Sequence, residues 1–249
     1  MGIFIKNDEQ IAIMRQASQI CAKTHELLAS YIKPGVSTGD LNRMANDYIV
    51  SQGAKPSFFG YRGFPAAICT SVNEEVIHGV PGIRRLKSGD IISIDIGVCY
   101  KRFHGDAART HGVGNVSEVH QKLIDSAKNA FFESVRYAKA GCRLHDMSAA
   151  IENYIDTQGF SVVTEWCGHG IGRQLHEDPQ IPHTRQDKRG PRLSRGMTLA
   201  IEPMVLESRT GETVTRNDTW TVVTKDGGFS AHYENTVLIT DGEPDVLTL

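Results

Sequence analysis

The feature that most constrains the fold is an internal repeat that relates the two halves of this 249-residue chain. Residues 35–54 align with residues 141–160 at a constant offset of 106, and six of these twenty positions are identical. At an offset of 107, residues 89–95 align with residues 196–202, and each of these segments starts with glycine and ends with an acid. Because the same elements recur in the same order, the repeat predicts two pseudo-symmetric α/β halves around one shared sheet.

The spacing of apolar residues assigns helices and strands to this repeat. Apolar side chains recur at helical spacing before Pro34 and Gly35, which end the first helix. The length and the 40% content of hydrophobic residues suit one domain over residues 1–249, with halves of about 1–112 and 113–249. We expect helices over residues 7–31, 38–52 and 118–139, and strands over residues 66–71, 90–98 and 103–110.

Acidic residues interrupt the apolar strands, which is costly unless a charged partner or a metal ion compensates them. Asp95 stands between two isoleucines, and Asp106 lies on the next expected strand. If these strands turn near Tyr100 and Lys101, residues whose numbers sum to 201 face each other. That register puts Asp95 opposite Asp106, so two like charges would repel unless a cation lay between them.

The second half supplies three further candidates. Pseudo-symmetry relates Glu202 to Asp95, and a hairpin that turns at residues 226–228 precedes Glu234 and puts Trp220 roughly opposite it. His169 has a glycine on each side, which lets the backbone approach closely and exposes the imidazole. Each of these residues alone is more typical of a salt bridge or a turn. Together, four carboxylates and one histidine favour a site for two divalent ions, which lie about 3.5–4 Å apart in such sites.

The bulk properties exclude several other classes of protein. The net charge of −2 gives no reason to expect a membrane or a specific nucleic acid as partner. The apolar runs are too short to span a bilayer, and the first ten residues do not form a signal peptide. The five cysteines are scattered and form no C-x-x-C pair, which is typical of reduced thiols in a cytoplasmic protein.

Short motifs along the whole chain resemble those of the type I methionine aminopeptidases. They are CTSVNE at 69–74, IHGVP at 77–81, ID at 94–95, FHGD at 103–106, GHGIG at 168–172, LHE at 175–177, AIEP at 200–203 and ENTV at 234–237. The resemblance implies the pita-bread fold, in which two pseudo-symmetric α/β halves share a central antiparallel sheet with helices on its outer face. It also implies removal of the initiator methionine from nascent proteins and peptides when the second residue is small.

The resemblance assigns roles to residues that match the motifs. Two divalent ions, drawn from Co, Mn, Fe and Zn, would be held by Asp95, Asp106, His169, Glu202 and Glu234. A metal-bound hydroxide would attack the first peptide bond, with Glu202 as proton shuttle. His78 would contact the substrate near the scissile nitrogen. His176 would form a hydrogen bond with the substrate carbonyl and with the tetrahedral intermediate. The methionine side chain would lie among Tyr61, Phe64, Cys69, Leu175 and Trp220, whose aromatic and thiol walls suit a thioether.

Two alternatives remain at this point. An Xaa-Pro aminopeptidase or dipeptidase resembles this fold and uses the same types of ligand, and a non-catalytic binding module on the same fold would typically lack some of them. Basic clusters at residues 84–87 and 185–195 are interpreted as solvated loops. The expected partners are the amino termini of nascent polypeptides, which brings transient proximity to the ribosome, and we expect a monomer.

Overall fold

The computed structural model describes residues 2–249, so Met1, which the expected domain includes, lies outside the described residues. Its helices are α1 (Asp8–Ala29), α2 (Thr38–Ser51), α3 (Glu118–Val135) and α4 (Leu144–Gln158), with a short 3-10 helix, η1 (Tyr61–Gly63). The strands of the first half are β1 (Lys55–Pro56), β2 (Cys69–Val72), β3 (Glu75–Ile77), β4 (Ile91–Tyr100) and β5 (Phe103–Gly112). Those of the second half are β6 (Ser161–Val162), β7 (Cys167–Gly170), β8 (Glu177–Pro182), β9 (Thr198–Ile201), β10 (Met204–Leu206), β11 (Thr213–Thr215), β12 (Val222–Thr224), β13 (Ser230–His232), β14 (Asn235–Leu238) and β15 (Asp245–Val246).

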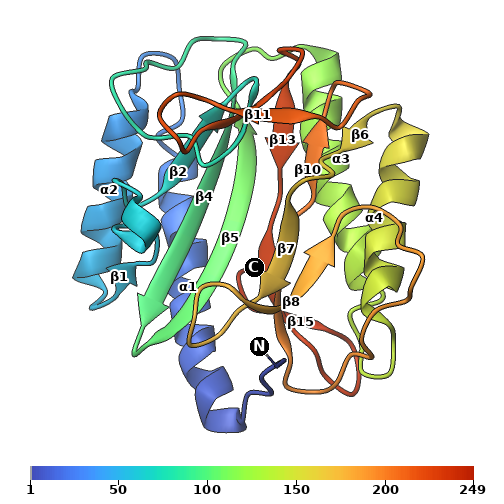
Figure 1. Ribbon diagram of the computed structural model, residues 1–249. Helices are drawn as coiled ribbons and strands as arrows, with labels where there is room; N and C mark the ends of the chain where they lie inside the picture. The colour runs from blue at the N-terminus through green and yellow to red at the C-terminus, as the bar shows by residue number, and fades with distance from the viewer. Residues whose placement is uncertain (1) are drawn as a thin grey trace.

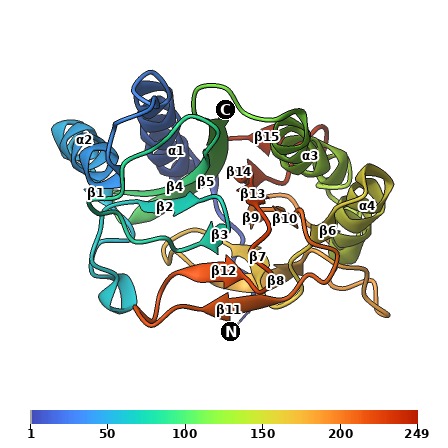
Figure 2. The same cartoon turned by 90° about the horizontal axis from the view of Figure 1, so that it is seen from above.

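Two helix pairs cover the outer side of the strands, as the repeat predicts. Figures 1 and 2 show α1 and α2 against the strands of the first half and α3 and α4 against those of the second. The side chains of Asn7 and Ser37 each accept a hydrogen bond from the backbone three residues on, which satisfies donors that α1 and α2 leave unpaired. Helix α3 ends four residues before the expected boundary. None of the helices in residues 2–249 combines the length and the apolar character that a membrane crossing needs.

The hairpin of β4 and β5 has a different register from the expected one. Asp95 pairs with Ala108, and Asp106 pairs with Gly97. The register moves by two because Lys101 and Arg102 form the turn, both with positive φ angles of 45° and 69°. Since side chains alternate with a period of two, this shift leaves both aspartates on one face of the sheet.

The two glutamates lie between strands, which corrects the prediction that they lie within them. Strand β9 pairs with β14, and β10 pairs with β13. Both pairings break at the same level, where Glu202 follows β9 and Glu234 precedes β14. The backbone therefore leaves the ladder at the point where these two carboxylates project.

The predicted hairpin around residues 226–228 is wrong. Strand β12 pairs with β3 and β11, whereas β13 pairs with β10, so the two arms belong to different sheets. Gly227 has a φ of 79° and turns the chain, but the hydroxyl of Thr224 bonds the carbonyl of Gly228 and the strands diverge. Trp220 is therefore not the cross-strand partner of Glu234.

The two halves meet where β5 lies beside β14. The backbone groups of Ala108 and Glu234 exchange hydrogen bonds of 3.3 and 3.0 Å. The hydroxyl of Thr236 accepts a hydrogen bond from the backbone amide of Asp106 and donates one to its backbone carbonyl, at 2.9 Å each. This junction joins the four-stranded sheet of the first half to the five-stranded sheet of the second. The predicted α/β architecture is confirmed, and its centre is the place where the acids gather.

Candidate active site

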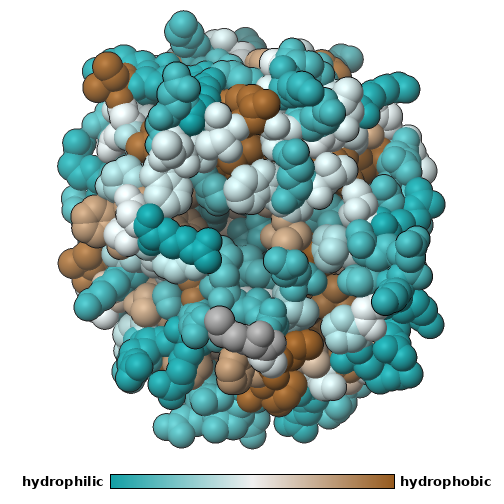
Figure 3. Space-filling view, in the orientation of Figure 1, coloured by the Kyte–Doolittle hydropathy of each residue, from teal (hydrophilic) through white to brown (hydrophobic). Residues whose placement is uncertain are grey.

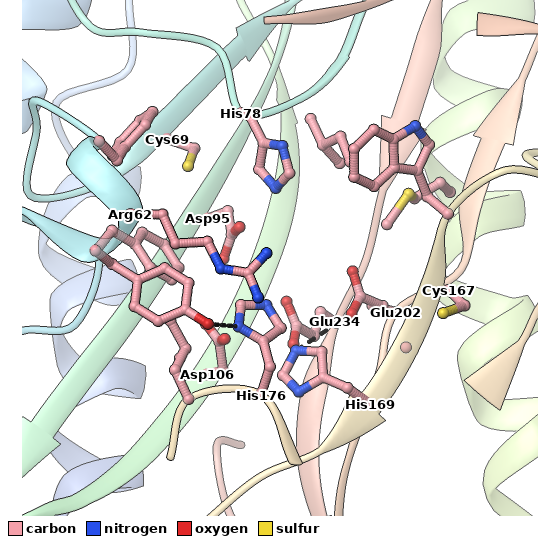
Figure 4. A pocket seen from close by; sticks show the side chains of 18 of the residues that line it. Arg62, Cys69, His78, Asp95, Asp106, Cys167, His169, His176, Glu202 and Glu234 are labelled. Atoms are coloured by element: carbon pink, nitrogen blue, oxygen red, sulfur yellow. Dashed lines mark hydrogen bonds and ion pairs between the residues drawn. The ribbon is translucent and has the colours of Figure 1, made fainter. Parts of the chain in front are cut away.

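A cavity of about 670 Å³ opens between the two halves, and all twelve residues expected at the site line it. Figure 3 shows the surface hollowed near the middle of the view. Figure 4 shows carboxylates and imidazoles from both halves converging in this hollow. Asp95 and Asp106 come from the β4–β5 hairpin, and His169 comes from β7.

We call the five candidate metal ligands the cage: Asp95, Asp106, His169, Glu202 and Glu234. Their donor atoms lie within reach of a shared cation. Asp106, His169 and Glu234 each offer one ligand atom within 4.8 Å of the others. The Nε2 of His169 lies 3.5 Å from Oε1 of Glu202. The Nδ1 of His169 lies 2.8 Å from the carbonyl of Gly170, so the other ring nitrogen is left to face the cavity.

Burial makes these carboxylates hard to ionise without a cation. It raises the pKa of Asp95 and of Glu202 to about 7. Burial, followed by the neighbouring carboxylates, raises the pKa of Asp106 and of Glu234 well above the usual range. No lysine or arginine within residues 2–249 forms an ion pair with any of the four, and Glu202 alone pairs with histidines, His169 and His232.

The unpaired oxygens of the cage fit a divalent ion. One carboxylate oxygen each of Asp95, Asp106 and Glu234 is buried without a hydrogen-bond partner. Buried polar atoms are usually satisfied, so these orphaned carboxylate oxygens fit a site for a divalent cation. Carboxylate oxygens with one imidazole are ligands for Mn, Fe, Co or Zn.

Two further histidines lie in the cavity as neutral side chains. Burial lowers the pKa of His78 to about 4 and that of His176 to about 3. The ring of His78 packs edge-on against Trp166, with centroids 5.4 Å apart. The Nδ1 of His176 lies 2.9 Å from the hydroxyl of Tyr61, and the two rings stack. This bond fixes the orientation of the imidazole of His176.

Apolar side chains form the adjoining wall. Phe64 packs edge-on against Trp220 at 5.2 Å, and Leu175 belongs to the same buried cluster. Cys69 is buried and pairs across β2 and β4 with Asp95, which brings this wall beside the cage. The five expected pocket residues therefore adjoin one another, with the carboxylates at one end.

Two residues at or next to the cavity were missed from the sequence. His232 is buried, and its Nε2 lies 3.5 Å from Oε2 of Glu202 and has no hydrogen-bond partner. Its position two residues before Glu234 is a signal that it shares a face with that acid. Arg62 lines the cavity from η1, where its φ of 50° is left-handed, and no sequence pattern points to it.

Comparisons with known proteins give the context of this site. Residues 12–241 match metallopeptidase family M24. The methionine aminopeptidase of Clostridium perfringens is 51% identical over 247 residues, and the match covers 99% of each chain. The structure of methionine aminopeptidase from Thermotoga maritima has a TM-score of 0.97 at 40% identity, with 99% of each chain covered. A Xaa-Pro dipeptidase from Bacillus anthracis has a TM-score of 0.78 at 26% identity, and the match covers 98% of this chain but 61% of the dipeptidase.

Proposed function

The chain belongs to metallopeptidase family M24 and is a metallo-aminopeptidase that removes amino-terminal methionine, and from this premise we propose how its residues divide the work. A divalent metal requirement comes with the family. The proposed ligands of two ions are Asp95, Asp106, His169, Glu202 and Glu234. The observation that supports this most strongly is that carboxylates with buried, unpaired oxygens line one cavity.

The cage would hold the Lewis acid of hydrolysis, a divalent metal, and it also provides the proton acceptor. Ions held there, drawn from Co, Mn, Fe or Zn, would lower the pKa of a water molecule and polarise the carbonyl of the first peptide bond. Glu202 takes the proton of the attacking water and passes it to the leaving amine.

The two neutral histidines act on the peptide bond itself. When the hydroxyl of Tyr61 donates to Nδ1 of His176, the Nε2 of that ring carries the proton. His176 then donates a hydrogen bond to the carbonyl oxygen, and the bond strengthens as negative charge develops there. His78 lies on the opposite side of the cavity in Figure 4 and contacts the scissile nitrogen.

The apolar wall selects methionine, and the mouth of the cavity selects the second residue of the substrate. Phe64, Cys69, Leu175 and Trp220 surround the thioether, with Tyr61 at the rim. The second residue lies beside His78, which Trp166 packs against, so only a small side chain fits there. The closer likeness to methionine aminopeptidases than to the Xaa-Pro dipeptidase supports a small residue, rather than proline specifically, at this position.

The setting of the enzyme is inferred from this substrate class. The substrates are the amino termini of nascent polypeptides, which places the work in the cytoplasm with transient proximity to the ribosome. We propose that residues 1–249 act as a single domain and as a monomer, because both halves of one chain contribute to the cage.

The direct test is hydrolysis of a Met-Ala-Ser peptide by metal-stripped protein refilled with one metal at a time. Turnover is expected with at least one of Co, Mn, Fe or Zn and not with the stripped protein. The Glu202→Ala variant is expected to lose turnover while it keeps its circular dichroism spectrum. Faster cleavage of a peptide with proline second than of one with alanine second would contradict the assignment.

A further inference from the structure

The charges that line the cavity are unevenly distributed. Seven acidic residues line it, whereas Arg62 is its only arginine or lysine. Among the described residues, the Arg62 side chain has no hydrogen bond or ion pair, and its guanidinium packs over the ring of Tyr61. The cavity therefore carries one positive side chain that the protein itself does not neutralise.

The backbone holds Arg62 in an unusual conformation that keeps this charge at the mouth. Arg62 sits in η1 with φ 50° and ψ 21°, a left-handed geometry that costs a side-chain-bearing residue about 1 kcal/mol or more. Its guanidinium carbon lies 5.5 Å from the centre of the Tyr61 ring. Figure 4 shows the guanidinium reaching toward His176, in front of the cage. Arg62 contributes to lowering the pKa of His176, which is consistent with this proximity.

We propose that Arg62 binds a carboxylate carried by the third residue of the substrate, so that peptides with Asp or Glu after the small second residue are preferred. The inference rests on the proposed function, which directs the methionine side chain toward Phe64 and Trp220 and the scissile bond toward His176. The rest of the peptide must then leave through the mouth, where Arg62 lies. A guanidinium at an exposed rim attracts a carboxylate and offers it two parallel hydrogen bonds.

The neighbouring acids make Arg62 decisive for such substrates. Lys6 compensates the charge of Glu177, whereas Glu165 accepts a hydrogen bond only from the neutral hydroxyl of Thr213 and keeps its negative charge at the wall. Without Arg62, an acidic third residue would meet only like charge there and would be disfavoured. Replacing Arg62 with glutamate is therefore expected to reverse the preference, not merely to weaken it.

The test compares kcat/KM for amidated Met-Ala-Asp and Met-Ala-Asn peptides with the metal-loaded enzyme. The aspartate peptide is expected to be favoured about three- to tenfold at about 0.01 M ionic strength, and the ratio is expected to approach one at about 1 M salt. In Arg62→Glu the ratio falls below one, and an amidated Met-Ala-Lys peptide becomes the better substrate. A general structural effect of the substitution would slow all peptides alike and would leave these ratios unchanged.

A matched variant controls for net charge. Arg136→Glu makes the same change in charge as Arg62→Glu, at an exposed arginine that does not line the cavity, and it is expected to leave the wild-type ratio intact. A second comparison uses Met-Ala-Ser with a free and with an amidated carboxyl terminus. A higher kcat/KM for the free acid shows that Arg62 also binds the terminal carboxylate of a tripeptide. The amidated Met-Ala-Asp and Met-Ala-Asn peptides lack that carboxylate, so they report on the side chain of the third residue alone.

The outcomes separate this inference from the proposed function. If wild type cleaves the asparagine peptide but shows no advantage for either kind of carboxylate, the role of Arg62 is overturned and the aminopeptidase assignment stands. The same holds if Arg62→Glu keeps the wild-type ratio. If wild type cleaves none of the amidated peptides with any metal, the proposed function fails and this inference fails with it.

Discussion

The buried ion pair between Lys6 and Glu177 connects the stability of the fold to the active-site segment that carries His176. Its side chains are 4% and 3% exposed, with 2.7 Å between Nζ and Oε2. The other oxygen of Glu177 accepts a hydrogen bond from the amide of Gln174 at 3.1 Å. The pair therefore fastens the segment at residues 172–177, which carries Leu175 and His176, to the amino-terminal segment.

Lys6→Met removes the charge but keeps most of the volume of the side chain. Breaking a buried ion pair from one side costs about 3–5 kcal/mol, because the remaining charge is left uncompensated. Since Glu177 keeps its bond to Gln174, we take the lower end, about 3 kcal/mol. For a chain of this size that lowers the unfolding midpoint by about 6–12 °C. Because Glu177 adjoins His176, kcat is expected to fall as well.

Urea unfolding and calorimetry of the metal-free protein measure this loss. Lys139→Met is the matched control, because its pair with Glu243 is 33% and 82% exposed and contributes less than about 1 kcal/mol. Adding Glu177→Gln to Lys6→Met is expected to recover part of the loss, since no unpaired charge remains. Equal losses in Lys6→Met and Lys139→Met, or losses in the double variant that simply add, would refute the reasoning.

Three further outcomes are expected. His232→Leu lowers the affinity for divalent metal about 10- to 100-fold in calorimetric titration, because Glu202 loses a neighbour that positions it. His232→Gln is expected to retain more of the metal affinity. Equal losses of affinity in the two variants would exclude a positioning role for His232. Tyr61→Phe lowers kcat/KM about fivefold, the worth of one hydrogen bond of about 1 kcal/mol to His176, and an unchanged value would show that this bond does not orient the ring. The metal-free protein is expected to lose stability as pH rises, because the pKa values of Asp95 and Glu202 in the folded state are raised to about 7. The contribution of these two groups to the free energy of unfolding is complete below about pH 4 and is lost as pH passes 7. Thermal unfolding midpoints that rise between pH 5 and 8 without metal would contradict this.

The sequence predicts the repeat and the convergence of the acids because both depend on order and periodicity. The register of the β4–β5 hairpin was wrong by two residues, yet Asp95 and Asp106 still share a face, since the face depends only on parity. The turn was not predictable, because Lys101 and Arg102 adopt positive φ angles without the glycine or asparagine that usually marks them.

The features that the sequence left open depend on long-range packing. The segment after β12 contains good turn residues, but β12 pairs with β11 and with β3. Strand β3 lies about 150 residues earlier in the chain, and no local pattern identifies it. The placement of Arg62 depends on the left-handed backbone of η1, and that of Lys6 depends on a contact across 171 positions. The structure therefore supplied the side chains at the mouth and in the supporting contacts, whereas the repeat, the strand acids and the motifs predicted the metal ligands.

The central claim is that five side chains hold a pair of divalent ions. Anomalous diffraction from crystals soaked in Mn²⁺ tests it most directly. Two peaks about 3.5–4 Å apart are expected, each bounded by oxygens or nitrogens of Asp95, Asp106, His169, Glu202 and Glu234. Peaks elsewhere on the protein, with none among these five residues, would contradict the account.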